Sequence, residues 1–224
     1  MYNLFLSGGG SNKETYVLDD LFLKSSGSRI LYLPVGLKRN FAGYDECVVW
    51  FSNMVASHNL TKKISVWIEL MNKKSEININ NFDAVYIGGA TDTLRLHNLF
   101  IKHNFYSQLA TFIEEGGLIY GGSGGATILG KSINYDQIEK GQQTVAENSA
   151  NLCMDYSIFT HLDGRNRKMI ESSKFGKVIG IPEKGGIRLD TGKRTIGYSG
   201  SGKAIVITGM GLREVEDGDC LENI

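Results

Sequence analysis

Residues 118–126 read LIYGGSGGA and contain the most informative turn of the chain. Leu118–Tyr120 is a short apolar run typical of a buried strand, and the residues that follow Gly124 favour a helix. Between them, Gly121–Gly125 matches the pattern G-x-S-x-G, in which a serine stands at a sharp turn from strand to helix. Side chains two positions before and after that serine would collide with the adjacent strand and helix. The stretch therefore predicts an α/β domain with Ser123 presented at a strand end.

The chain on either side continues this alternation of strand and helix. Apolar runs followed by glycine, and then by residues with helical spacing, occur at Tyr2–Ser7, Arg29–Val35 and Ala84–Ile87. Such an order predicts a mainly parallel sheet flanked by helices on both faces, in three layers. Nearer the C-terminus, short apolar runs separated by glycine-containing turns predict antiparallel strands that finish the sheet: Val178–Ile181, Ile187–Leu189, Arg194–Ile196 and Ala204–Thr208.

The composition indicates one α/β domain over residues 1–224 and excludes several classes of protein. Hydrophobic residues make up 42%, and 24 basic residues balance 24 acidic ones, so no nucleic-acid partner is expected. No apolar run is long enough for a membrane span, and no signal peptide is evident. Cys47, Cys153 and Cys220 form no CxxC pair, which argues against a zinc site or a disulfide framework. We expect a cytoplasmic protein without metal, and a homodimer is compatible with the sequence.

A serine at such a turn suits nucleophilic catalysis, since the following helix N-terminus favours developing negative charge. The N–H of Gly124 can donate to an oxyanion. A second donor should come from another strand end, and Gly88-Gly89 after Ala84–Ile87 offers Gly89. An ordinary strand-to-helix turn is the alternative interpretation of that corner.

The serine also needs a base, and His161 is the one histidine that follows a short apolar run able to place it at a strand end. The other three histidines, His58, His97 and His103, are interpreted as surface or partly packed side chains. The carboxylate that would orient the imidazole stays open among four residues: Asp136, Glu139, Asp163 and Glu183.

No cofactor motif is complete. The nearest approach is Gly197–Ala204, which almost matches the phosphate loop G-x-x-x-x-G-K-[ST]. Its last residue, Ala204, lacks the hydroxyl that would hold Mg²⁺, and a strand rather than a helix is expected after it. We therefore expect no cofactor.

Three motifs together resemble peptidase family S51, the serine peptidases that include aspartyl dipeptidase and cyanophycinase and share a class I glutamine amidotransferase-like fold. These motifs are Gly88–Leu94, Gly121–Ala126, and His161 followed by arginines at 165 and 167. The resemblance spans roughly Tyr2 to Thr208. It departs from the family pattern at Gly124, where alanine is usual. The glutamine amidotransferases themselves fit less well, because they use a cysteine nucleophile and position 123 is serine.

The resemblance implies Ser123 as nucleophile, His161 as base, and the N–H groups of Gly89 and Gly124 as the oxyanion hole. It also implies a carboxylate in the segment after the nucleophile helix, where Asp136 is the nearest candidate.

Arg165 and Arg167 follow the histidine, and guanidinium groups bind carboxylates in a bidentate way. They would favour short peptides with acidic residues, or else lie on a solvated helix face. The main rival hypothesis is a non-catalytic binding protein that kept the fold and lost the full triad.

Overall fold

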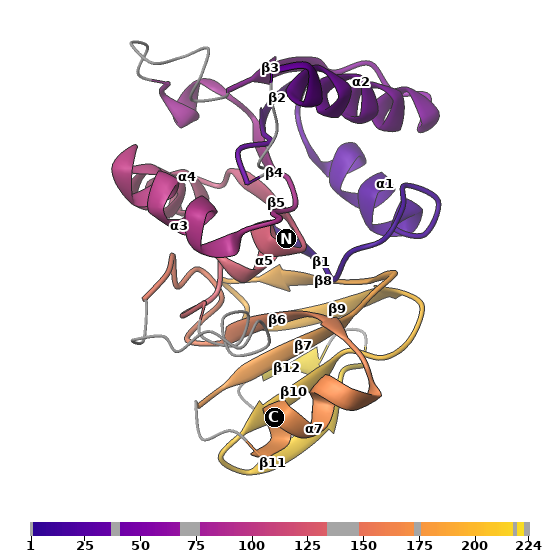
Figure 1. Cartoon of the computed structure of the whole chain (residues 1–224), viewed down its shortest axis with the longest axis vertical. Coiled ribbons are helices and arrows are strands. Elements are labelled where there is room, and N and C mark those ends of the chain that lie inside the picture. The colour runs from indigo at the N-terminus through magenta and orange to yellow at the C-terminus, as the bar shows by residue number, and fades with distance from the viewer. Residues whose placement is uncertain are drawn as a thin grey trace.

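The structure is a computed structural model that describes residues 2–36, 41–67, 77–133, 148–172, 176–216 and 219–221. Its larger sheet contains β1 (Leu4–Ser7), β2 (Arg29–Leu33), β3 (Lys63–Val66), β4 (Ala84–Ile87), β5 (Leu118–Gly122), β8 (Gly185–Asp190), β9 (Thr195–Gly200) and β12 (Asp219–Cys220). The strand order is β12-β9-β8-β1-β5-β4-β2-β3 (Figure 1). β1, β5, β4, β2 and β3 run parallel, and β8, β9 and β12 are antiparallel to their neighbours. The predicted α/β fold with a mainly parallel sheet is confirmed.

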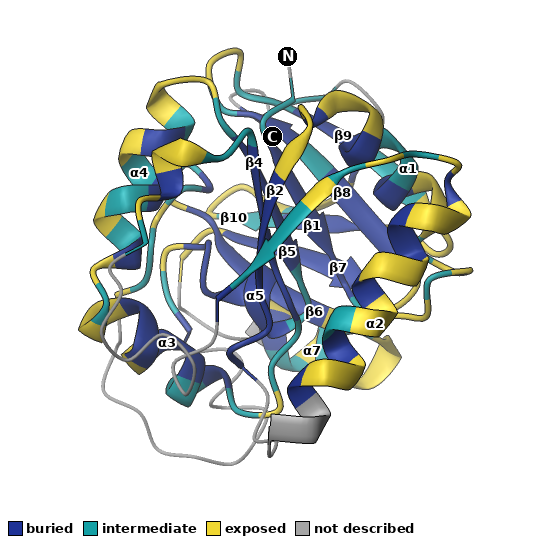
Figure 2. Cartoon of the chain, turned by 90° about the horizontal axis from the view of Figure 1, so that it is seen from above, coloured by how far each residue is buried: buried dark blue, intermediate teal, exposed yellow. Residues whose placement is uncertain are grey.

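Helices cover both faces of this sheet, as the alternation predicted. They are α1 (Tyr16–Ser25), α2 (Phe41–Ser57), α3 (Thr93–Lys102) and α4 (Phe105–Glu114), with a 3-10 turn η1 (Ile79–Asn81) before β4. Figure 2 shows α1 and α2 on one side of the sheet and α3 and α4 on the other. Successive residues of a strand point to opposite faces. Accordingly Phe5 packs in the cluster that includes α1 and α2, whereas Leu4 and Leu6 pack in the cluster that includes α3 and α4.

A second, four-stranded sheet lies at the end of the molecule away from α2 (Figure 1). It contains β6 (Ser157–Leu162), β7 (Val178–Pro182), β10 (Ile205–Thr208) and β11 (Gly211–Glu214), in the order β11-β10-β7-β6. β6 and β7 are parallel, joined through α7 (Gly164–Ser172), and the other pairs are antiparallel.

The C-terminal strands therefore divide between two sheets. The expectation that all of them finish the main sheet holds for β8 and β9 but not for β7 and β10. A short apolar strand has the same pattern whichever sheet it joins, so its partner is decided by packing. Ile179 and Val206 of the second sheet pack in the same buried cluster as Leu4 and Leu6 of the first. The single domain over residues 1–224 stays a prediction.

The carboxyl ends of β1, β5 and β4 meet at one edge of the main sheet, because parallel strands end at the same side. Gly8-Gly9-Gly10 follows β1, Ser123 follows β5, and Gly88-Gly89 follows β4. β5 lies between β1 and β4. The three glycine-containing corners are thus adjacent, with the serine in the middle, which is where ligands bind in open parallel sheets.

Candidate active site

Ser123 occupies the turn between β5 and the short helix α5 (Gly124–Thr127), with backbone φ 49° and ψ −118°. A positive φ is uncommon for a residue with a side chain and is retained only where the surroundings enforce it. Here the N–H of Ser123 donates to the Ser7 carbonyl at 3.0 Å, and its own carbonyl accepts the N–H of Ala126 at 2.8 Å. The turn is held from both sides in a strained shape that presents the side chain.

The glycines of this turn are required for steric reasons. A Cβ on Gly121 would lie 2.7 Å from the Gly125 carbonyl oxygen, and one on Gly125 would lie 2.6 Å from the Ile87 carbonyl oxygen. Both distances are too short for real atoms, so positions two before and two after Ser123 exclude any larger residue. At Gly124, a Cβ would lie 2.7 Å from the Ala90 Cβ. Position 124 is therefore glycine and not alanine because Ala90 already occupies the space that its Cβ would need.

His161, in β6, reaches Ser123 from the second sheet. Its Nε2 lies 2.7 Å from Ser123 Oγ, within the distance expected for a nucleophile and its base. The backbone N–H of His161 donates to the Gly8 carbonyl at 3.1 Å, and its carbonyl accepts from Asn166 Nδ2 at 2.8 Å. These bonds fix a residue whose own φ is 55°. The two residues come from separate sheets, yet the backbone of each is bonded to the end of β1, Ser123 to Ser7 and His161 to Gly8.

The imidazole packs directly on the backbone of Gly9. A Cβ there would lie 2.4 Å from His161 Cε1, and Gly9 has φ +113°. Its neighbour Gly10 has φ +129°, but a Cβ on Gly10 would meet nothing closer than 3.4 Å. The two glycines thus have similar backbone conformations, which a side chain would strain, and differ in whether that side chain would meet the imidazole.

We expect Gly9→Ala to displace the His161 ring and to lower kcat/KM about 100-fold, the usual result of a misplacement of about 1 Å at a reacting group. Gly10→Ala is the matched control, since it adds comparable strain without touching the ring. Peptide hydrolysis and urea unfolding of both variants check this. Equal activity of the two variants would show that the Gly9 contact does not position the imidazole.

A buried hydroxyl network lies beneath these two residues and was not expected from the sequence. Tyr120 O–H donates to Asp19 Oδ1 at 2.7 Å and also shares a hydrogen bond with Ser7, whose Oγ accepts the Gly9 N–H at 3.2 Å. Burial raises the pKa of Asp19, and its hydrogen bonds with Tyr120 and Thr15 oppose that rise. Burial likewise raises the pKa of Tyr120 well above its ordinary value, so its hydroxyl stays protonated. The network links the strand before Ser123 to the loop under His161.

The predicted oxyanion donors lie at this corner. A Cβ on Gly89 would be 3.7 Å from the Ser123 Cβ, so the Gly88-Gly89 turn is in van der Waals range of the serine. Gly124 is the first residue of α5, and the first N–H groups of a helix have no intrahelical acceptor. Both N–H groups stand next to Ser123, and their role stays a prediction.

Two of the four candidate carboxylates for orienting His161, Asp163 and Glu183, lie among the described residues. Asp136 and Glu139 lie outside the described residues. Asp163 caps α7, because its Oδ1 accepts the N–H groups of Arg165 at 2.8 Å and Asn166 at 2.9 Å, and these bonds hold its pKa below the ordinary value. Glu183 is exposed on the turn between β7 and β8. Asp163 is thus engaged by the helix terminus.

The two arginines lie on α7 with carboxylates of this chain. The Arg165 side chain is 96% exposed, and its guanidinium lies 3.5 Å from Asp163. Arg167 Nε donates to Glu171 Oε1 at 2.9 Å, one helical turn away. This arrangement corresponds to the solvated helix face that the sequence left open as the alternative.

The remaining histidines correct one expectation. His58 and His97 are buried rather than at the surface or partly packed. His97 Nδ1 lies 2.8 Å from the Tyr106 hydroxyl, and the His58 ring stacks on Tyr16. The sequence predicts an exposed side chain for a histidine on or beside a helix, because it does not show the partner that makes burial possible. Here the partners are the Tyr106 hydroxyl for His97 and the Tyr16 ring for His58. Within the described ranges no group of three or more histidine, cysteine or acidic side chains could hold a metal ion.

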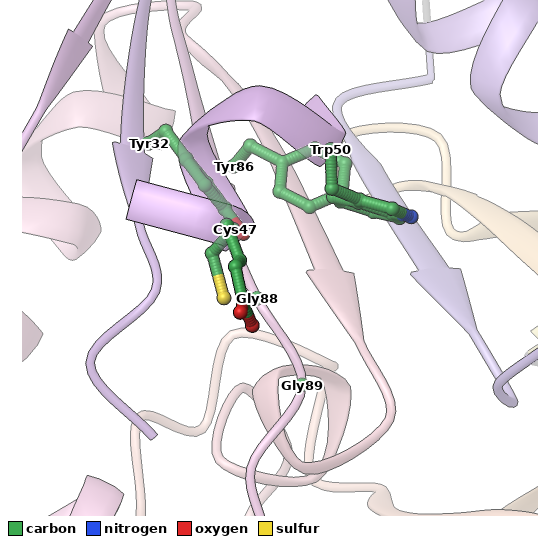
Figure 3. Close-up of a pocket in the computed structure, with 7 residues that line it drawn as sticks. Tyr32, Cys47, Trp50, Tyr86, Gly88 and Gly89 are labelled. Atoms are coloured by element: carbon green, nitrogen blue, oxygen red, sulfur yellow. The ribbon is translucent and has the colours of Figure 1, made fainter. Parts of the chain in front are cut away.

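A pocket of about 390 Å³ adjoins the serine and was also missed by the sequence interpretation. It is lined by Tyr32, Glu46, Cys47, Trp50, Tyr86, Gly88 and Gly89, and Figure 3 shows the labelled side chains grouped above the Gly88-Gly89 turn. Its residues come from β2, α2 and the end of β4, which are far apart in the chain. The only sequence signal was Gly88-Gly89 itself.

The comparisons with known proteins bear on this fold. A family model described as peptidase family S51 matches residues 4–196. A peptidase from an acI-B1 Actinobacterium superposes with a TM-score of 0.76 at 13% identity, covering 98% of this chain and 96% of that one. A Listeria monocytogenes EGD-e protein proposed to be a peptidase E superposes with a TM-score of 0.66 at 19% identity, covering 90% and 100%. At these identities the two structures show the fold alone. A comparison with curated proteins found no match.

Proposed function

The chain belongs to peptidase family S51, and on this premise we propose that it is a serine-type peptidase that hydrolyses short peptides from Ser123. The observation that carries the proposal is the 2.7 Å contact between Ser123 Oγ and His161 Nε2 at a strained strand-to-helix turn. A strained serine with an imidazole in hydrogen-bond reach is the arrangement that nucleophilic catalysis needs. Among the described helices none is long and apolar enough to cross a membrane.

In the proposed reaction, His161 takes the Ser123 proton as Oγ attacks the peptide carbonyl carbon. The tetrahedral intermediate collapses when the protonated imidazole gives that proton to the leaving amine, which leaves an ester on Ser123. Water, deprotonated by the same imidazole, then hydrolyses the ester and releases the carboxylic acid. His161 therefore serves both as base and as acid.

The negative charge that forms on the carbonyl oxygen needs donors fixed in advance. We assign this role to the N–H groups of Gly89 and Gly124, which flank Ser123. Backbone N–H groups held by a rigid corner need no reorganisation as the charge develops, which is the source of their effect on rate. Removal of one such donor typically costs about 3 kcal/mol of transition-state stabilisation.

A fluorophosphonate probe tests the proposal directly. The wild-type chain should be labelled on the peptide that contains Ser123, identified by mass spectrometry, and heat-denatured protein should not be labelled. If the folded protein stays unmodified while a known serine hydrolase in the same tube reacts, the chain is the non-catalytic binding protein that the sequence left as the rival.

Asp136 is proposed as the carboxylate that orients His161. Asp136→Asn should lower kcat up to about 10⁴-fold, because an amide disfavours the imidazole tautomer that accepts the serine proton. Glu139→Gln is the matched variant, since it removes a carboxylate from the same segment. Wild-type rates for Asp136→Asn with a loss in Glu139→Gln would move the role to Glu139.

A preference of the enzyme for acidic residues is tested by comparing hydrolysis of the dipeptides Asp-Leu and Asn-Leu. Their side chains have nearly the same shape and differ by one negative charge. We expect the two dipeptides to be cleaved at rates within about threefold, because exposed ion pairs contribute little and both arginines already have carboxylate neighbours. Much faster cleavage of Asp-Leu, reduced by Arg165→Ala or Arg167→Ala, would instead support recognition of an acidic side chain by α7.

A further inference from the structure

The pocket beside Gly89 is continuous with the corner that holds the nucleophile. Gly89 lines the pocket, and a Cβ on the same residue would be 3.7 Å from the Ser123 Cβ. A peptide whose carbonyl carbon sits on Ser123 Oγ is therefore within one residue of the pocket mouth. The question is which part of that peptide faces it.

The position of His161 decides the direction of the peptide. His161 is anchored by Gly8 and packs on Gly9, in the loop after β1, whereas Gly88-Gly89 follows β4. Because β1 and β4 lie on opposite sides of β5, the imidazole and the pocket lie on opposite sides of Ser123. The leaving amine must face the imidazole that protonates it. The side of Ser123 away from the imidazole then remains for the carbonyl oxygen, at the Gly89 N–H, and for the acyl part of the substrate, beside the pocket.

The walls of the pocket are mainly aromatic. Rings of Tyr32 and Tyr86 and the indole of Trp50 line it, together with the thiol of Cys47 and the exposed Glu46. Its volume of about 390 Å³ lies at the lower end of the range of about 300–1,000 Å³ for small-molecule sites. Aromatic faces of this kind bind aromatic or long aliphatic side chains through dispersion and release of water.

The floor of this pocket is held rigidly by ring packing. Tyr32 stacks on Phe51 with centroids 4.4 Å apart, and Tyr86 stacks on Tyr120 at 4.3 Å. Burial raises the pKa of Tyr86 well above its ordinary value, so its hydroxyl adds no charge to the pocket. A pocket with fixed walls loses little entropy when a side chain enters it.

Trp50 is the most exposed aromatic side chain that lines the pocket. Its side chain is 40% exposed, although it also approaches Phe51 and Tyr86 at centroid distances of 6.3 and 6.4 Å. A large indole left in water next to an aromatic pocket is the kind of residue that dominates binding energy at interfaces. A ligand side chain in the pocket would cover it.

We propose that this pocket binds the side chain of the residue on the acyl side of the scissile bond and selects aromatic or long aliphatic residues. The assignment rests on the proposed nucleophile Ser123, and it names a substrate class: short peptides with phenylalanine, tyrosine or leucine at that position. Recognition comes from the walls on β2, β4 and α2.

The first experiment measures kcat/KM for the dipeptides Phe-Leu, Leu-Leu, Ala-Leu, Asp-Leu and Lys-Leu. Phe-Leu and Leu-Leu should exceed Ala-Leu by at least about tenfold, the usual discrimination of an apolar pocket. Trp50→Ala should lower kcat/KM for Phe-Leu about tenfold and change Ala-Leu less than twofold. Val49→Ala is the matched control, because Val49 is 59% exposed on the same helix and does not line the pocket.

The second experiment separates binding from catalysis. In the Ser123→Ala protein, Phe-Leu should shift the emission of the exposed Trp50 to shorter wavelength, whereas Trp67 is only 2% exposed and contributes a constant background. Ala-Leu at equal concentration should produce no shift, and neither dipeptide should shift the Ser123→Ala/Trp50→Ala protein.

The outcomes distinguish the two proposals. Absence of hydrolysis and of probe labelling, with the Phe-Leu shift retained, would overturn the catalytic role and leave the pocket only as a binding site for an aromatic or long aliphatic side chain. Hydrolysis with equal rates across the series, or an unchanged Phe-Leu rate in Trp50→Ala, would overturn the pocket assignment alone. A preference for Lys-Leu that disappears in Glu46→Gln would also overturn it, since recognition would then be electrostatic.

Discussion

Ser123→Ala should abolish peptide hydrolysis, with a fall in kcat of about 10⁴–10⁶-fold, because loss of the nucleophile removes the covalent route and leaves only binding and the oxyanion donors. Stability should change by less than about 0.5 kcal/mol, since the substitution removes one exposed oxygen and keeps the same backbone strain. Rates on Phe-Leu and urea unfolding check both statements. Retained hydrolysis in a homogeneous sample would assign the nucleophile elsewhere.

Ser123→Gly is the matched partner of that variant. Both lack the hydroxyl, but glycine adopts φ 49° without the strain that a side chain adds. The glycine variant should therefore be more stable than the alanine variant by about 1 kcal/mol, the lower end of the cost of a strained residue. Such a difference would show that the turn stores strain for the sake of presenting the serine. Equal stabilities would mean that the turn is relaxed.

His161→Ala should lower kcat by about 10⁴–10⁶-fold, comparable to loss of the nucleophile, because residues that act as one unit contribute non-additively. The double variant Ser123→Ala/His161→Ala should therefore be no slower than either single variant. His103→Ala is the control, since His103 packs against the Trp67 ring on the side of the sheet covered by α3 and α4. It should keep wild-type rates and lose only stability. Substantial activity in His161→Ala would remove the base assignment despite the 2.7 Å contact.

The nucleophile turn could be predicted from the sequence because the serine and its glycines are close together in the chain. A side chain on Gly121 would meet Gly125 and Ala126 of the same turn, and one on Gly125 would meet the end of the adjacent strand at Ile87. Both restrictions show directly in the sequence as glycines at fixed spacing from Ser123. The alternation of strand and helix is predictable for a similar reason, since the spacing of apolar residues along the chain follows from which faces of each element are buried.

The residues around His161 predict that it lies at a strand end. They do not predict that it lies next to Ser123. β6 joins a second sheet, and the backbone N–H of its histidine donates to the Gly8 carbonyl in the loop that follows β1 of the main sheet. The resemblance to a family suggested the pair, and the geometry brings the two atoms together. Similarly, the sequence left open whether Arg165 and Arg167 bind substrate or lie on a solvated helix face, and only the structure shows Asp163 and Glu171 beside them.

By itself, the sequence determined the parallel α/β core and the sharp turn at Ser123, because both depend on local periodicity and on contacts within the turn. Only the tertiary structure decided which sheet each C-terminal strand joins, that His58 and His97 are buried, and that Tyr32, Trp50 and Tyr86 form one pocket beside Gly89. These features depend on pairing between segments far apart in the chain. A short apolar run or a single aromatic residue has the same sequence pattern whichever segment it packs against. The free energy of packing in the folded chain therefore determines its partner.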